Sequence, residues 1–161
     1  MRSGVRLGVD VGKVRVGIAR SDPAGMIATP VATLARADQL EDRFLALVEE
    51  HEPVEVVVGL PLSMSGGETA STADAREVAM LLARTAGVPV RLVDERLSTV
   101  GAQRSLQAAG RSTRQSRSVI DQVAAVIILQ HALDFERTAD RPPGVLVDTA
   151  SGEGEERHAH G

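Results

Sequence analysis

The segment LGVDVGKVRVGIARSD, residues 7–22, decides how the first part of this chain folds. It contains two short apolar runs separated by Asp10 and Gly12, a composition typical of two β-strands joined by a tight turn. A third apolar run follows and contains Pro30, which cannot donate a backbone hydrogen bond and therefore favours a sheet edge. Together these runs predict an antiparallel meander. We expect its strands at residues 5–9, 14–20 and 27–34.

The remainder of the chain alternates between helical and extended patterns. We expect helices from Leu40 to just before Pro53, over 72–85, over about 99–109 and over about 119–136, and strands at 54–58 and 88–93. The order βββαβαβαα predicts an α/β domain over residues 1–140, with a five-stranded mixed sheet between helices. Residues 141–161 are polar, glycine-rich and acidic, and we expect them to form a disordered tail.

Composition excludes several classes of protein. The chain has 161 residues, 43% apolar and 25% charged, a balance typical of one globular domain. No apolar run approaches the ~20 residues of a membrane span, and no signal peptide is recognisable, so we expect a cytoplasmic protein without a membrane partner. The absence of cysteine excludes disulfides, thiolate zinc sites and cysteine nucleophiles.

Charge is unevenly distributed along the chain. The net charge is −4, yet residues 84–117 contain seven arginines and only two acids, a local net charge of +5. Such a stretch attracts phosphate, although a solvated arginine-rich surface would have the same composition. Because Phe44 and Phe135 are the only aromatic residues, we expect any nucleic acid to be bound through its backbone and shape rather than by base stacking.

Asp10 is the first candidate for a chemical role. An acid at the exit of a buried strand projects toward the carboxyl edge of the sheet, where open α/β sheets bind ligands. In isolation, an ordinary Asp/Gly turn explains Asp10 and Gly12 better. The segment is not a phosphate-binding P-loop, because that motif around Lys13 would need a glycine at Leu7 and a hydroxyl at Val14.

Two further acids stand at comparable places. Asp94 and Glu95 follow the last predicted strand, and alternation sends their side chains to opposite sides, so only one should reach a shared crevice. The alternative is a solvated Glu95 beside a helix cap. Asp121 shares a helical face with inward-facing alanines, although Ser118 and Asp121 also have the spacing of a capping box.

Converging acids repel one another and need cations. Mg²⁺, a hard ion that prefers carboxylate oxygens and phosphate, fits such a group.

Four stretches in order along the chain resemble the YqgF (RuvX) family of Holliday junction resolvases, in the RNase H-like superfamily. They are LGVDVGKVRVGIARSD (7–22), VVGLPLSMSG (57–66), DERLST (94–99) and DQVAAVIIL (121–129), and the resemblance spans residues 5–136. It implies an RNase H-like fold, with three antiparallel strands followed by parallel ones and helices on both faces of the sheet. It also implies that Asp10, Glu95 and Asp121 are the metal-binding catalytic carboxylates.

The resemblance implies a nuclease of the two-metal-ion type that uses Mg²⁺ or Mn²⁺. Two substrates are described for the family, the 5′ end of precursor 16S ribosomal RNA and four-way DNA junctions, so structured RNA or branched DNA is the expected partner. Junction cutting requires paired incisions and would favour a homodimer. A non-catalytic nucleic-acid-binding module is the remote alternative, against which the three intact acids argue.

Basic and hydroxyl side chains near these acids are the expected phosphate ligands. Many family members have a lysine at the position of Val14, and in this chain Lys13 or Arg15 stands beside it. Ser63, in the loop after Gly59, could bond phosphate, although a purely structural turn explains that loop equally well. The other expected phosphate ligands are Arg96, Arg104, Arg111, Arg114 and Arg117.

Overall fold

A computed structural model describes residues 1–37, 39–97 and 114–149, with only the backbone described at 97 and at 114–120. The strands are β1 (Arg6–Val11), β2 (Arg15–Ser21), β3 (Ala28–Ala35), β4 (Glu55–Leu60), β5 (Val90–Asp94) and β6 (Val145–Leu146). The helices are α1 (Leu40–His51), α2 (Ala70–Ala86), the short 3₁₀ turn η1 (Glu95–Leu97) and α4 (Arg114–Ala139). The helix predicted over 99–109 lies outside the described residues.

The sheet is mixed, as predicted, in the order β3-β2-β1-β4-β5-β6. Antiparallel pairing joins β1 to β2 and β2 to β3, whereas β4 pairs in parallel with both β1 and β5. Pro30 lies in the edge strand β3, where the β2–β3 register shifts. The prediction of five strands was wrong by one. Two residues that we expected in a disordered tail form β6, which pairs antiparallel with β5.

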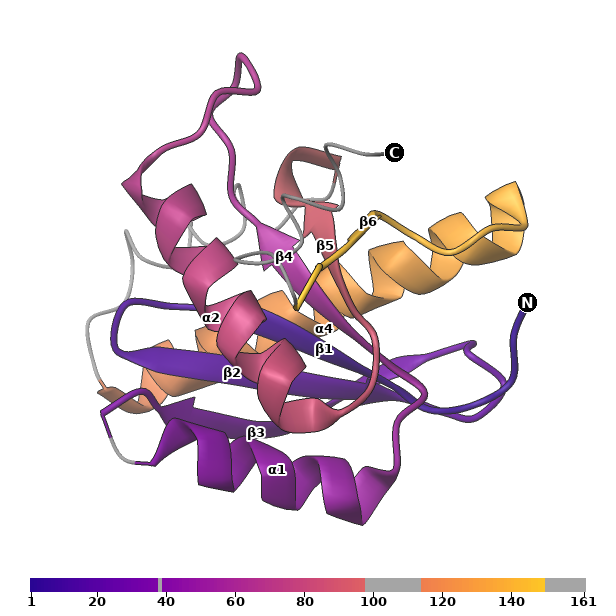
Figure 1. Cartoon of the computed structure of the whole chain (residues 1–161), viewed down its shortest axis with the longest axis horizontal. Coiled ribbons are helices and arrows are strands. Elements are labelled where there is room, and N and C mark those ends of the chain that lie inside the picture. The colour runs from indigo at the N-terminus through magenta and orange to yellow at the C-terminus, as the bar shows by residue number, and fades with distance from the viewer. Residues whose placement is uncertain (38, 98–113, 150–161) are drawn as a thin grey trace.

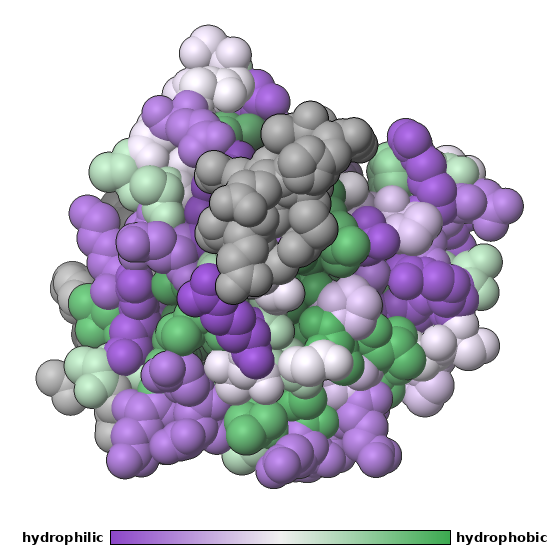
Figure 2. Space-filling view, in the orientation of Figure 1, coloured by the Kyte–Doolittle hydropathy of each residue, from purple (hydrophilic) through white to green (hydrophobic). Residues whose placement is uncertain are grey.

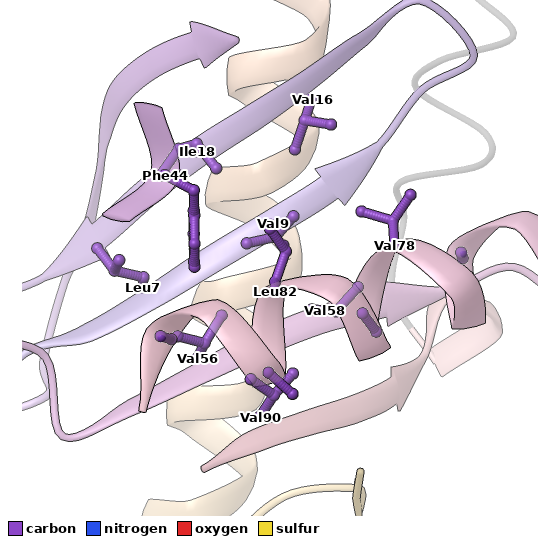
Figure 3. Close-up of a cluster of buried hydrophobic side chains, with 14 of the residues drawn as sticks. Leu7, Val9, Val16, Ile18, Phe44, Val56, Val58, Val78, Leu82 and Val90 are labelled. Carbon is purple, nitrogen blue, oxygen red and sulfur yellow. The ribbon is translucent and has the colours of Figure 1, made fainter. Parts of the chain in front are cut away.

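Helices cover both faces of the sheet (Figure 1). On one face α1 and α2 enclose the larger apolar core, shown in Figure 3. Alternation along β1 explains this: Leu7 and Val9 point into that core, while Gly8 and Asp10 face the opposite side. A second apolar cluster lies between the sheet and α4, which contributes Ala124, Ala125, Ile128, Leu129, Ala132 and Leu133.

Helix α4 approaches the sheet very closely because glycines lie beneath it. A Cβ atom added to Gly8 would lie 2.6 Å from the Cβ of Leu129, and one added to Gly17 would lie 2.1 Å from the carbonyl oxygen of Asp121. Carbon atoms in contact are normally about 3.5–4.0 Å apart. Only glycine therefore lets this helix lie so near β1 and β2.

Buried ion pairs anchor the carboxyl-terminal part of α4. Glu136 accepts hydrogen bonds from Arg2 (Nη2 to Oε1, 2.7 Å) and from Arg6 (Nη2 to Oε2, 3.3 Å). The bonds from Arg2 lower the pKa of Glu136 to about 2. Glu55, also buried, accepts from Arg2 and from Arg91. Since burying such charges unpaired is very costly, this network fixes the position of α4 against the start of the sheet.

Among the described residues, the structure shows no helix that is long and apolar enough to cross a membrane.

Candidate active site

Asp10 lies near the carboxyl end of β1 and its side chain is 0% exposed. Asp10 pairs with Gly17 on β2. On its other side lies the parallel strand β4, where Val58 pairs with Val9. The residue after Val58, Gly59, therefore flanks Asp10. Neighbouring strands are about 4.8 Å apart. Asp10 thus lies between two glycines, on the face of the sheet covered by α4.

Asp121 lies above the first of these glycines. It belongs to the third turn of α4, which begins at Arg114, and this excludes the alternative that Asp121 caps the start of the helix. The backbone of Asp121 is in contact with Gly17, and its Oδ2 accepts a hydrogen bond of 3.2 Å from Nε of Arg15. A Cβ added to Gly12 would lie 3.8 Å from Oδ1 of Asp121. The carboxylate therefore faces the turn that connects β1 and β2.

Glu95 lies above the second glycine. It is the first residue of η1, directly after β5, and is partly buried. A Cβ added to Gly59 would lie 2.8 Å from Oε2 of Glu95. Its neighbour Asp94 instead accepts hydrogen bonds from Nε and Nη2 of Arg96 (3.0 and 2.6 Å), which lower the pKa of Asp94. The two adjacent acids diverge, as strand alternation predicts.

The three predicted acids therefore gather over neighbouring strands at one edge of the sheet. Asp10 is central, with Asp121 above the glycine on one side and Glu95 above the glycine on the other. Within the described part of the chain, no three acidic or histidine side chains are already close enough together to coordinate an ion. The donor set nevertheless suits a hard divalent cation, because all three donors are carboxylates and Asp10 is fully buried.

The predicted phosphate ligands have diverse surroundings. Lys13 is exposed in the turn after β1. Arg15 is engaged by Asp121, and Arg96 by Asp94. Ser63 accepts a hydrogen bond from the backbone of Gly67 (2.9 Å). Four further arginines were predicted: Arg114 and Arg117 lie on the first turns of α4 with only their backbone described, and Arg104 and Arg111 lie outside the described residues.

Two features of the site were not predicted. Gly17 and Gly59, which were not among the candidate site residues, lie directly against the acidic residues. The predicted strands 5–9 and 14–20 left Asp10 in the turn, whereas in the structure β1 extends to Val11 and Asp10 pairs with Gly17. Arg15 was expected to contact phosphate, and its bond to Asp121 joins residues 106 positions apart, a distance that no local pattern reveals.

An apolar cavity of about 350 Å³ lies beside β5, α4 and β6 and is separate from these acids. Its polar lining residues are Arg76, Asp94 and His131, and none of the three gathered carboxylates contributes to it. The group of acids, rather than this cavity, is where hydrolytic chemistry could occur.

The chain resembles known proteins in both sequence and fold. A family model described as RuvX, Holliday junction resolvase, matches residues 4–135. A protein of Clavibacter michiganensis is 60% identical over 152 residues, covering 91% of this chain and 93% of that protein. One from Streptomyces coelicolor is 54% identical over 151 residues, covering 92% and 90%. Both are named as candidate pre-16S rRNA nucleases.

Solved structures resemble the chain in fold. RuvC of Thermus thermophilus in complex with a Holliday junction substrate superimposes with a TM-score of 0.55 at 18% identity, covering 86% of this chain and 98% of that one. A second structure of Thermus thermophilus RuvC gives a TM-score of 0.52, also at 18% identity, covering 86% and 99%. At this level of identity the likeness concerns the fold alone. It agrees with the RNase H-like architecture expected from the sequence.

Proposed function

The chain belongs to the RuvX family of Holliday junction resolvases, and from this premise we propose that it is a metal-dependent nuclease that processes the 5′ end of precursor 16S ribosomal RNA. The names of its curated relatives favour this substrate. The observation that carries the proposal is the position of Asp10 between Gly17 and Gly59, the two glycines against which Asp121 and Glu95 lie.

The three carboxylates would hold the metal. Two Mg²⁺ or Mn²⁺ ions bound there would activate a water molecule and stabilise the leaving oxygen of a phosphodiester. Asp10 is placed centrally and would hold the metal together with Asp121 on one side and Glu95 on the other. The buried ion network at Glu136 and the glycines under α4 hold Asp121 on the face of the sheet where Asp10 lies.

Basic residues around the acids would neutralise the phosphates of the substrate. Lys13 is exposed in the turn beside Asp10, and Arg15 becomes available for a phosphate if cations take over Asp121. The exposed Arg96 lies next to Glu95. Phosphate contacts of this kind position the nucleic acid through its backbone rather than through its base sequence.

Cleavage of four-way DNA junctions is the second candidate. The family description and the fold shared with RuvC favour it. Such an activity requires two coordinated incisions, so a junction resolvase of this size would act as a homodimer. The RNA activity carries no such requirement.

The test supplies purified wild-type protein with a precursor 16S RNA fragment and, separately, with a four-way DNA junction, in Mg²⁺, Mn²⁺ or chelator. We expect metal-dependent cleavage of the RNA at discrete positions, at least a thousandfold slower in Asp10→Asn. Asp134→Asn is the matched control, because it removes an exposed carboxylate of α4 far from the acidic edge. Full activity of a folded Asp10→Asn protein would refute the assignment, and discrete cleavage of the junction alone would favour the second candidate.

A further inference from the structure

The loop between β4 and α2 presents one strongly exposed apolar side chain. Met64 is 93% exposed, and the next most exposed large apolar residue among those described, Val145, is 70% exposed. The loop extends beyond the sheet (Figure 1) and appears as a knob standing clear of the body of the molecule (Figure 2). Met64 is therefore presented to the surroundings rather than to the core.

Hydrogen bonds make this loop a closed turn. The backbone N–H of Ser63 donates to the carbonyl of Gly67 (2.9 Å), and the N–H of Gly66 donates to the carbonyl of Ser63 (2.8 Å). The N–H of Gly67 also donates to Oγ of Ser63 (2.9 Å), and Gly66 has a φ of 91°, which glycine adopts without strain. Exposure of Met64 at the tip is thus imposed by a defined turn and does not result from local fraying.

The same turn is connected to the acidic edge. Nη1 of Arg96, the residue after Glu95, donates to the carbonyl of Met64 (3.4 Å) and lies against Gly66. The loop begins directly after β4, the strand whose Gly59 lies under the Glu95 carboxylate. Movement of η1 would therefore move both the carboxylate of Glu95 and the tip of the loop.

The chemistry of the tip suits an unstacked base beside a phosphate. The hydroxyls of Ser63 and Ser65 are exposed, and a guanidinium lies beneath the turn. Methionine is long, unbranched and polarizable, and it is among the side chains that proteins insert between bases to unstack them. Neither aromatic residue can serve here, because Phe44 is 0% exposed and Phe135 lies in the last turns of α4, beyond the catalytic edge.

We propose that Met64 inserts against a base at an unpaired or kinked point of the nucleic acid and thereby positions the neighbouring phosphodiester over the three carboxylates. This inference rests on the proposed nuclease function and adds a specificity contact to it. It predicts a preference for cleavage next to branch points or the ends of helices over cleavage within uniform duplexes. Met64 would contact the base only, with no part in the hydrolysis itself.

The test uses the full-length protein and two fluorescent probes. One is a four-way DNA junction with 2-aminopurine at the branch point, and the other is an RNA hairpin with 2-aminopurine where the helix meets a single-stranded 5′ extension. Binding without added divalent metal is followed by anisotropy and unstacking by 2-aminopurine fluorescence. Cleavage of the unlabelled substrate in Mg²⁺ is measured in parallel.

We expect wild-type protein to raise the fluorescence of the probe that it cleaves. Met64→Ala should reduce this rise at least threefold and slow cleavage about tenfold, while Met64→Leu, which keeps apolar bulk, should retain most of both. Met26→Ala is the matched control, because it removes another exposed methionine, 52% exposed in the turn between β2 and β3, and it should leave the fluorescence rise unchanged. Circular dichroism should show that all variants are folded.

Two results would overturn the inference in distinguishable ways. If wild type cleaves a substrate and Met64→Ala gives the same fluorescence rise and cleavage rate, the role of Met64 is refuted while the nuclease function stands. If wild type neither binds nor cleaves either nucleic acid, the nuclease function fails and the inference fails with it.

Discussion

Replacing Gly17 with alanine should disturb the acidic edge more than any change of similar size elsewhere in the sheet. The added Cβ would lie 2.1 Å from the carbonyl oxygen and 2.5 Å from the carbonyl carbon of Asp121. Both are backbone atoms, which cannot rotate away, so α4 must recede by about 1 Å to restore normal contact. Overpacking of this kind costs about 1–3 kcal/mol, and we expect a loss near the upper end because a whole helix must move.

The same displacement should impair catalysis. A shift of about 1 Å in a catalytic group can slow a reaction roughly 100-fold, and here it would move Asp121 relative to Asp10. Equilibrium unfolding in urea measures the stability, and Mg²⁺-dependent cleavage at saturating substrate measures the rate. Both should fall in Gly17→Ala, with the protein still folded at 25 °C.

Gly8→Ala is the matched control. Its Cβ would lie 2.6 Å from the Cβ of Leu129, two helical turns beyond Asp121. We expect a comparable loss of stability and a cleavage rate within a few-fold of wild type. The reasoning would be refuted if Gly17→Ala were as stable and as active as wild type, or if both variants lost activity equally.

Two further predictions concern charged groups. The Arg15→Gln variant should bind Mn²⁺ roughly fivefold more tightly in isothermal titration calorimetry. The reason is that a guanidinium within ~6 Å of a divalent ion repels it by about 1 kcal/mol in a water-like dielectric. Weaker binding would contradict a competition between Arg15 and the metal for Asp121. Glu136→Gln should lower stability at pH 7 by about 3 kcal/mol. The pKa of Glu136 is about 2 in the folded protein against 4.5 ordinarily. The contribution of its charge to the free energy of unfolding is therefore complete above pH 4.5 and is lost as the pH falls toward 2. Urea unfolding from pH 7 to 2 should show the variant converging on wild type, and a constant difference would exclude this role.

Local patterns were sufficient to predict most of the fold. Apolar runs with turn residues between them identified five strands, and Pro30 correctly indicated an edge strand. Strand β6 was missed because two residues are too few to show an alternating pattern, and its residues are exposed. The first turns of α4 were missed because the polar segment that contains Arg114 has no apolar periodicity to indicate a helix.

The sequence pattern singled out three acids as candidates but not their relative placement. Asp10 and Glu95 were candidates because they follow predicted strands, and Asp121 because it lies on an inward-facing helical position. The contacts that position them depend on which elements pack together, and this is not encoded in local spacing. Gly17 lies under Asp121, and Arg15 bonds to it, only because α4 crosses β2 near the turn after β1.

Direct measurement of Mn²⁺ binding tests the central claim most simply. Electron paramagnetic resonance quantifies free Mn²⁺ in titrations of wild type and of Asp10→Asn, Glu95→Gln, Asp121→Asn and the control Asp134→Asn. We expect wild type and the control to bind Mn²⁺ alike, and each of the other three variants to bind it at least tenfold more weakly. Unchanged affinity in any folded variant of the three acids would contradict their assignment to one metal site.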